Sequence, residues 1–153
     1  MMRFSVILPA ALLAMALLLI SGCAIGKKEW PSAVPKEDRF SLHVEQGMFE
    51  GDCLLLSIRV SGAVNRLWAV NVQYESVGLD EGDGCEGCPF MPRTAEYFAR
   101  GQKGFDLNGN VLSVSVCGLN PDKQYRFRIA GENELSGMDL EYTEVFETLS
   151  QID

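Results

Sequence analysis

The fold is decided by Gly118-Leu119-Asn120-Pro121-Asp122-Lys123-Gln124-Tyr125-Arg126-Phe127-Arg128-Ile129. The first half of this stretch holds a glycine, a proline and an aspartate, which favour a turn. In the second half, Tyr125, Phe127 and Ile129 alternate with two arginines. Strict alternation is typical of a β-strand that has one face in the core and the other in water. The stretch therefore predicts a turn followed by a half-buried strand, with Arg126 and Arg128 in solvent.

The same alternation recurs along the rest of the chain from Arg39 onward. It predicts buried faces at Leu54, Leu56, Ile58 and Val60, at Trp68, Val70, Val72 and Tyr74, and at Leu112, Val114 and Val116. A weaker pattern covers residues 40–44, and a last run covers residues 142–149. No ten-residue stretch has a helical period. Short alternating strands separated by turn residues predict an all-β antiparallel sandwich over residues 39–150.

Residues 118–129 resemble the E–F corner and F strand of fibronectin type III domains, where a leucine, a proline-containing turn and a tyrosine recur at this spacing. The resemblance implies a tyrosine corner formed by Tyr125 and Leu119, in which the tyrosine hydroxyl bonds to the backbone upstream. These domains usually carry a tryptophan in strand B, where this chain has Ile58, so Trp68 is expected to fill part of that core volume. The stretch between residues 77 and 110 exceeds the family's needs, so a different immunoglobulin-like sandwich is the alternative.

Residues 1–22 are predicted to be a signal peptide, because Arg3 precedes an apolar stretch that is short for a membrane span. Residues 20–23, Ile-Ser-Gly-Cys, resemble the lipobox of bacterial lipoproteins. The resemblance implies acylation of Cys23, which would anchor the chain stably through two or three acyl chains. Because Ala24 is not aspartate, it also implies the outer membrane in a Gram-negative host. The alternatives are a transmembrane helix, or an ordinary signal peptide with an accidental cysteine.

Residues 23–38 are expected to form the lipidated N-terminus and a charged, proline-containing tether. The full chain has 13 basic and 21 acidic side chains, and loss of Arg3 with the signal makes the net charge −9. This charge argues against nucleic acid and anionic lipid as partners.

The chain has one histidine and no catalytic signature around any serine, which predicts no enzyme and no cofactor. Asp106-x-Asn108-x-Asn110 begins like a calcium loop, but Val111 replaces the required glycine, so no metal is expected.

Four cysteines remain after Cys23, and an even number in an exported chain suggests two disulfides with three pairings open. The fibronectin resemblance makes strands B and E neighbours, which implies a Cys53–Cys117 bond and leaves Cys85 with Cys88. Pro89 excludes a haem attachment site at this pair. Acidic neighbours should raise rather than lower its thiol pKa, so a structural disulfide is favoured over a redox centre.

Three functional hypotheses follow. The first is a membrane-anchored lipoprotein that presents its sandwich to a protein partner through the acidic loop over residues 79–93, with exposed Phe90 and Met91. The alternative is that these two side chains fold back as a lid over the core, and the loop's carboxylates could also bind a cation weakly. The second hypothesis is a structural spacer that uses a sheet edge for strand addition. The third is a redox protein using Cys85 and Cys88.

Overall fold

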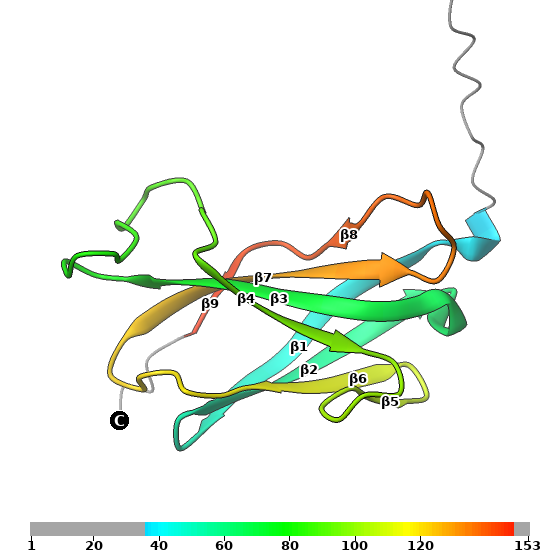
Figure 1. Cartoon of the computed structure of the whole chain (residues 1–153), viewed down its shortest axis with the longest axis horizontal. Coiled ribbons are helices and arrows are strands. Elements are labelled where there is room, and N and C mark those ends of the chain that lie inside the picture. The colour runs from blue at the N-terminus through cyan, green and yellow to red at the C-terminus, as the bar shows by residue number, and fades with distance from the viewer. Residues whose placement is uncertain (1–35, 149–153) are drawn as a thin grey trace, which may run out of the picture. The chain divides into compact units, whose positions relative to one another are not determined.

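The computed structural model describes residues 36–148, which form two antiparallel sheets packed face to face (Figure 1). The predictions made on residues 1–35, including Cys23, lie outside the described residues. The strands are β1 Phe40–Glu50, β2 Cys53–Gly62, β3 Leu67–Val77, β4 Thr94–Ala99, β5 Asp106–Asn108, β6 Val111–Val116, β7 Gln124–Asn133, β8 Glu141–Tyr142 and β9 Phe146–Glu147. Two short 3-10 helices, η1 Lys36–Asp38 and η2 Val64–Arg66, complete the described elements.

The strand order confirms the predicted all-β, immunoglobulin-like sandwich. The first sheet has the order β1-β2-β6-β5, and the second has the order β4-β3-β7-β8, with β9 also paired to β7. This arrangement matches the ABED and CFG sheets of immunoglobulin domains, with one extra strand beside strand C. The long stretch between residues 77 and 110 is thereby explained, because it contributes β4 to one sheet and β5 to the other.

The core lies between the sheets and uses the predicted alternating faces. Its largest fully buried side chains are Phe127, Leu54, Ile58, Leu67, Leu112, Ile129, Val60, Val70, Val72 and Val116. All of them come from β2, β3, β6 and β7, the central strands of the two sheets. Gly131 allows β7 to approach β1 closely, since a Cβ atom there would lie 2.8 Å from side-chain atoms of both Phe40 and Leu42.

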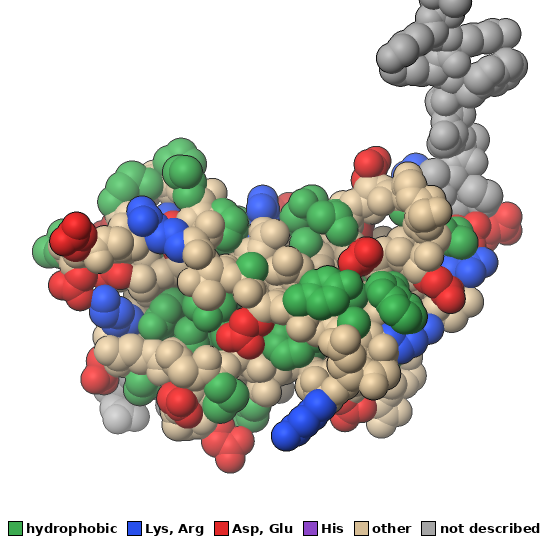
Figure 2. Space-filling model, in the orientation of Figure 1, with side chains coloured by type: hydrophobic (Ala, Val, Ile, Leu, Met, Phe, Trp, Pro, Cys, Tyr) green, Lys and Arg blue, Asp and Glu red, His purple; other side chains and the backbone are tan. Residues whose placement is uncertain are grey.

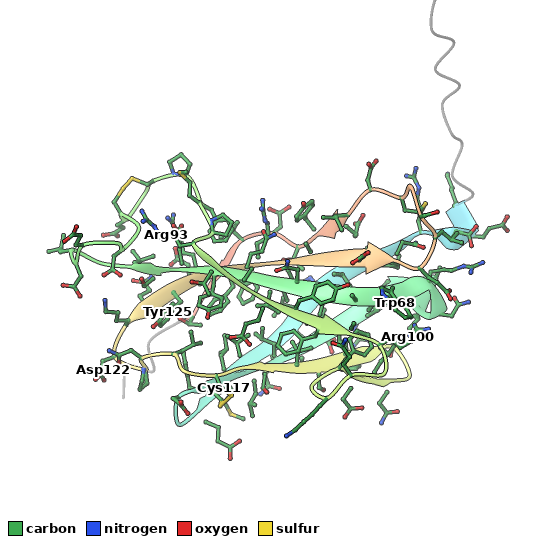
Figure 3. The ribbon with its side chains drawn as sticks, viewed as in Figure 1. Trp68, Arg93, Arg100, Cys117, Asp122 and Tyr125 are labelled. Atoms are coloured by element: carbon green, nitrogen blue, oxygen red, sulfur yellow. A yellow bond between two sulfur atoms is a disulfide. The ribbon has the colours of Figure 1, made fainter. Side chains whose placement is uncertain are left out.

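The prediction that Trp68 fills the core is wrong. Its side chain is 42% exposed, whereas that of Leu67 is fully buried. The cause is a register shift between Leu67 and Ala69 in the pairing of β3 with β7. A bulge adds one residue to a strand, and a one-residue slip moves side chains to the other face of the sheet. Trp68 therefore points to solvent at the start of β3 (Figure 3).

The tyrosine corner is present as the sequence predicts. The hydroxyl oxygen of Tyr125 accepts a hydrogen bond from the Asn120 backbone N–H at 3.0 Å. Leu119 is buried in the core, and its N–H donates to the Asp52 carbonyl at 2.9 Å. The turn before β7 is thus tied both to its own strand and to the start of β2.

The two ends of the sandwich carry different connections (Figure 1). The N-terminal pole holds η1 and the β2–β3 and β7–β8 connections, whereas the distal pole holds the β1–β2, β3–β4 and β6–β7 connections. Asp38 is part of the folded unit, because its carboxylate accepts from Arg66 Nε at 2.8 Å and its carbonyl accepts from Asn133 Nδ2 at 2.8 Å. The folded unit therefore begins a few residues before the predicted boundary at Arg39.

Candidate functional site

The distal loop, defined as residues 78–93, joins β3 to β4 and folds against the outer face of the second sheet. Its backbone is fixed at both ends. The Gly84 N–H donates to the Ser76 carbonyl at 2.7 Å, and the Gly78 N–H donates to the Gly84 carbonyl at 3.0 Å. At the other end, the Arg93 N–H donates to the Tyr74 carbonyl at 3.1 Å. The loop is therefore an ordered extension of the sheet.

A buried ion pair lies under the distal loop. Glu75 and Arg126 face each other across β3 and β7 and form a salt bridge, with side chains only 2% and 9% exposed. Arg126 Nη1 donates to the Cys88 carbonyl at 2.6 Å, and Glu75 Oε1 accepts the Met91 N–H at 3.3 Å. The prediction that Arg126 lies in solvent is wrong, because the loop covers this part of the outer face. The cover fits closely, since a Cβ atom on Gly84 would lie 2.8 Å from Glu75 Oε2.

The four described cysteines form the two expected disulfides. Cys53 and Cys117 are bonded, with Cα atoms 3.9 Å apart, directly beyond the Leu54–Val116 pair of β2 and β6. Cys85 and Cys88 are bonded within the distal loop. All four cysteines lie at the distal pole, because they stand at the β1–β2, β3–β4 and β6–β7 connections.

The acidic side chains of the distal loop are partly neutralised by one lysine. Lys123 Nζ contacts Asp80 Oδ2 at 2.8 Å and Asp83 Oδ2 at 3.1 Å. The pKa of Asp83 is lowered, first by the hydrogen bond from the Ser76 hydroxyl and then by that from Lys123. The pKa of Lys123 is raised by its hydrogen bonds to Asp80 and Asp83. These carboxylates are already engaged by Lys123, and over residues 36–148 no group of three or more His, Cys, Asp or Glu could hold a metal ion.

The two predicted interaction residues differ in their placement. Phe90 is half-buried, and the guanidinium carbon of Arg128 lies 5.3 Å from its ring centroid. It therefore folds back onto the outer face of the second sheet, away from the core between the sheets. Met91 is 69% exposed, and Leu79, which the sequence did not single out, is fully exposed. Figure 2 shows hydrophobic and acidic side chains together at this end of the molecule.

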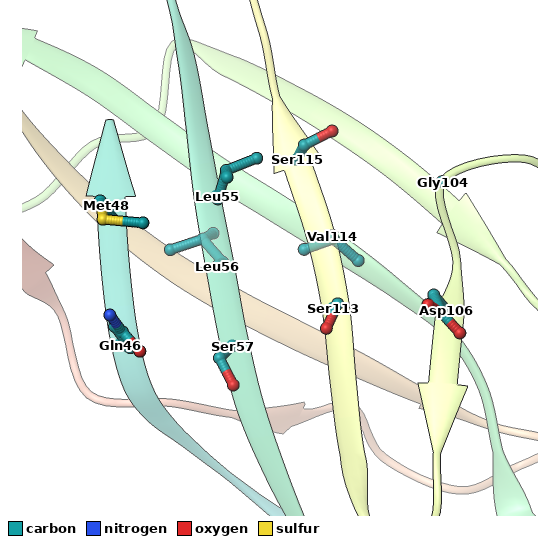
Figure 4. Close-up of a pocket in the computed structure, with 10 residues that line it drawn as sticks. All are labelled: Gln46, Met48, Leu55, Leu56, Ser57, Gly104, Asp106, Ser113, Val114 and Ser115. Carbon is teal, nitrogen blue, oxygen red and sulfur yellow. The ribbon is translucent and has the colours of Figure 1, made fainter. Parts of the chain in front are cut away.

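A second candidate site lies on the outer face of the first sheet (Figure 4). It is a shallow pocket of about 340 Å³. It forms where the short side chains of Ser57, Ser113 and Ser115 on β2 and β6 lie between Met48 of β1 and Asp106 of β5. Asp106 at its rim lies in strand β5, so the stretch that began like a calcium loop is instead part of a β-hairpin. The sequence did not predict this pocket, because serines that alternate with core residues indicate only a strand face in contact with solvent.

The sheet edges carry features that discourage strand addition. β1 has a register shift between Val44 and Gln46, β5 is three residues long, and β8 and β9 are separate two-residue segments. In edge strand β4, the inward-facing Glu96 accepts a weak hydrogen bond from the Tyr74 hydroxyl at 3.5 Å, and burial raises its pKa. Bulges, short edges and inward-pointing charges are the devices by which natural sheets avoid pairing with other chains. These edges do not favour the spacer hypothesis.

No protein-family model and no curated protein matches this chain. Over residues 36–148, no helix has the length and apolar character needed to cross a membrane. The described part of the chain offers two candidate sites, and the apolar side chains of the distal loop are the more exposed, since Met91 is 69% exposed and Met48 of the pocket is 47% exposed.

Proposed function

We propose that this protein is a bacterial lipoprotein that presents its β-sandwich to a protein partner through the distal loop. In this proposal Cys23 carries the lipid that holds the chain on a membrane, which is the outer membrane in a Gram-negative host. The proposal assigns no reaction, cofactor or nucleic acid. It rests on the lipobox-like residues 20–23 for the anchor and on the distal loop for the recognition surface.

One observation carries the proposal: the distal loop is held firmly yet presents apolar side chains to solvent. The salt bridge of Glu75 with Arg126, the Lys123 contacts and the disulfide order its backbone. Leu79 and Met91 nevertheless remain exposed. A surface that is ordered before binding loses less entropy when a partner docks, and exposed apolar side chains on such a surface are typical of interaction sites.

The topology supports an orientation in which the distal loop lies at the end of the domain opposite to the lipid attachment. The described chain starts with η1 at the N-terminal pole, and the distal loop lies at the opposite pole. A chain of residues 23–35 can span at most about 45 Å when fully extended. A lipid on Cys23 would thus be joined to the domain through its N-terminal pole, and the distal loop would be at the end of the domain opposite to the attachment point.

The recognition half of the proposal is tested by crosslinking in cells. A photoreactive amino acid at Met91 should crosslink a discrete partner, and Leu79→Ser should reduce that crosslink at least fivefold. The matched control is a photoreactive amino acid at Tyr97, which is 52% exposed on strand β4. Equal crosslinking from both positions, or no effect of Leu79→Ser, would contradict the proposal.

The anchoring half is tested separately. Cys23→Ser should move the protein from the membrane fraction to the soluble fraction, while incorporation of a labelled fatty acid should fall to background. If the Cys23→Ser protein stays membrane-bound, the anchor is not the acyl group and this half of the proposal is wrong.

A further inference from the structure

We propose that the Cys85–Cys88 disulfide is a redox-operated latch that holds the distal loop over the buried ion pair. The inference deepens the proposed recognition function, because it concerns the same loop and states when that loop is in its closed form. Oxidised cysteines keep the loop against the second sheet, and reduced cysteines release it.

The disulfide acts on the contact that closes the cover. The Cys88 carbonyl accepts a hydrogen bond from Arg126, and the Cys88 N–H donates to the Cys85 carbonyl at 3.2 Å. The four-residue ring closed by the two sulfurs therefore fixes the turn that aims this carbonyl at the guanidinium. Cys85 is exposed, so a reductant can reach the bond.

The open state is accessible because the loop covers charges rather than a large apolar surface. Glu75 and Arg126 lose hydration when the loop closes, and burial of an ion pair offsets much of the attraction between its charges. Lifting the loop returns both groups to water. Phe90 is the large apolar side chain packed under this cover, and it is already half-exposed. Loss of the ring is therefore expected to shift the loop toward the open form.

The chemical step is thiol–disulfide exchange with a protein dithiol of the exported compartment. A thiolate of the dithiol attacks one sulfur and forms a mixed disulfide, which breaks when the second thiolate attacks. Two electrons and two protons pass to Cys85 and Cys88, which become thiols, and the dithiol becomes a disulfide. The reverse exchange with an oxidised dithiol protein closes the latch.

Cys53 and Cys117 provide the internal contrast. They join β2 and β6, which are already held by register pairs from Leu54–Val116 to Arg59–Val111. Loss of this bond should lower the stability of the whole sandwich without lifting the distal loop. Loss of the Cys85–Cys88 bond should lift the loop with a smaller loss of global stability.

Amide hydrogen exchange of the full-length protein in detergent tests the latch. In Cys85→Ser/Cys88→Ser, exchange at the Met91 and Arg93 amides should rise at least tenfold. The Tyr125 and Ile129 amides of β7 should change less than twofold, because their bonds to Thr148 and Thr143 lie outside the loop. Unchanged exchange at Met91 and Arg93 would overturn the proposal.

Chemical reduction provides a second measurement on the unmutated chain. Dithiothreitol treatment should raise exchange in the distal loop in step with the fraction of Cys85 and Cys88 that is alkylated in separately quenched aliquots, and reoxidation of the unalkylated protein should reverse the increase. Alkylation of both cysteines without faster loop exchange would refute the latch, even if Met91 still crosslinks a partner. If Leu79→Ser does not reduce the crosslink from Met91 while reduction still opens the loop, the recognition function is refuted and the latch is not.

Discussion

The two disulfides should contribute very differently to global stability. The Cys53–Cys117 bond spans a sequence separation of 64, and the Cys85–Cys88 bond spans 3. In the chain-entropy model, a ring as long as the first stabilises the fold by about 4 kcal/mol, and one as short as the second by about 2 kcal/mol at most. The measured difference in unfolding free energy between the two variants should exceed the difference between these two figures. Loss of the short ring also releases the distal loop, which returns two buried charges to water and so offsets part of the stability that is lost.

Urea unfolding followed by tryptophan fluorescence measures this difference. With a denaturant slope of about 1.5 kcal/mol per M, Cys53→Ser/Cys117→Ser should lower the midpoint by about 2 to 3 M urea. Cys85→Ser/Cys88→Ser should lower it by about 1 M or less. The slope should stay the same in both variants. Equal midpoint shifts, or a larger shift for the short ring, would refute the reasoning from ring size.

Three further predictions concern the core, the tyrosine corner and the acidic loop. Leu67→Ala should cost about 2 to 5 kcal/mol of unfolding free energy and Trp68→Ala about 0.5 kcal/mol, as measured by urea unfolding followed by circular dichroism, because only Leu67 is buried. Tyr125→Phe should cost about 1 to 3 kcal/mol by the same measurement, because it leaves a backbone N–H in the turn without its acceptor. The carboxyl of Asp83 should titrate below the usual value of about 3.9 when followed by carbon-13 NMR, and Ser76→Ala should raise that pKa. Since the folded pKa is the lower one, the stabilisation from Asp83 is present above about pH 4 and is lost as pH falls further.

Alternation along the central strands was enough to predict the sheets, because each central strand has one face in a single continuous core. Leu54, Leu56, Ile58 and Val60 follow a period of two without interruption and are all buried. The same reasoning failed at Trp68, where the bulge shifts the phase by one residue. Nothing in the local sequence marks that bulge, since both Leu67 and Trp68 suit a core position. The pairing partner in β7 decides between them.

The candidate site was less predictable, because it depends on a segment without periodicity. The phase of Arg126 along β7 was predicted correctly, but its burial was not, since that depends on the distal loop folding over it. A carboxylate at Glu75, in phase with the polar residues of β3, could have suggested an ion pair across the sheet. The disulfide pairing was predictable only through the fibronectin type III resemblance, which implies which strands are neighbours. The exposure of Leu79 depends on loop geometry and was not.

The opposed poles also determine how the sandwich would carry a mechanical load. If Cys23 carries a lipid and the distal loop holds a partner, a force that pulls the two apart would act along the strands. β1 enters at the N-terminal pole and pairs with β2 from Phe40–Gly62 to Glu50–Cys53. Antiparallel hydrogen bonds run perpendicular to the strands, so tension along β1 loads them together in shear instead of opening them one at a time. The fold would thus resist extraction of its anchored strand while it holds a partner at the other end.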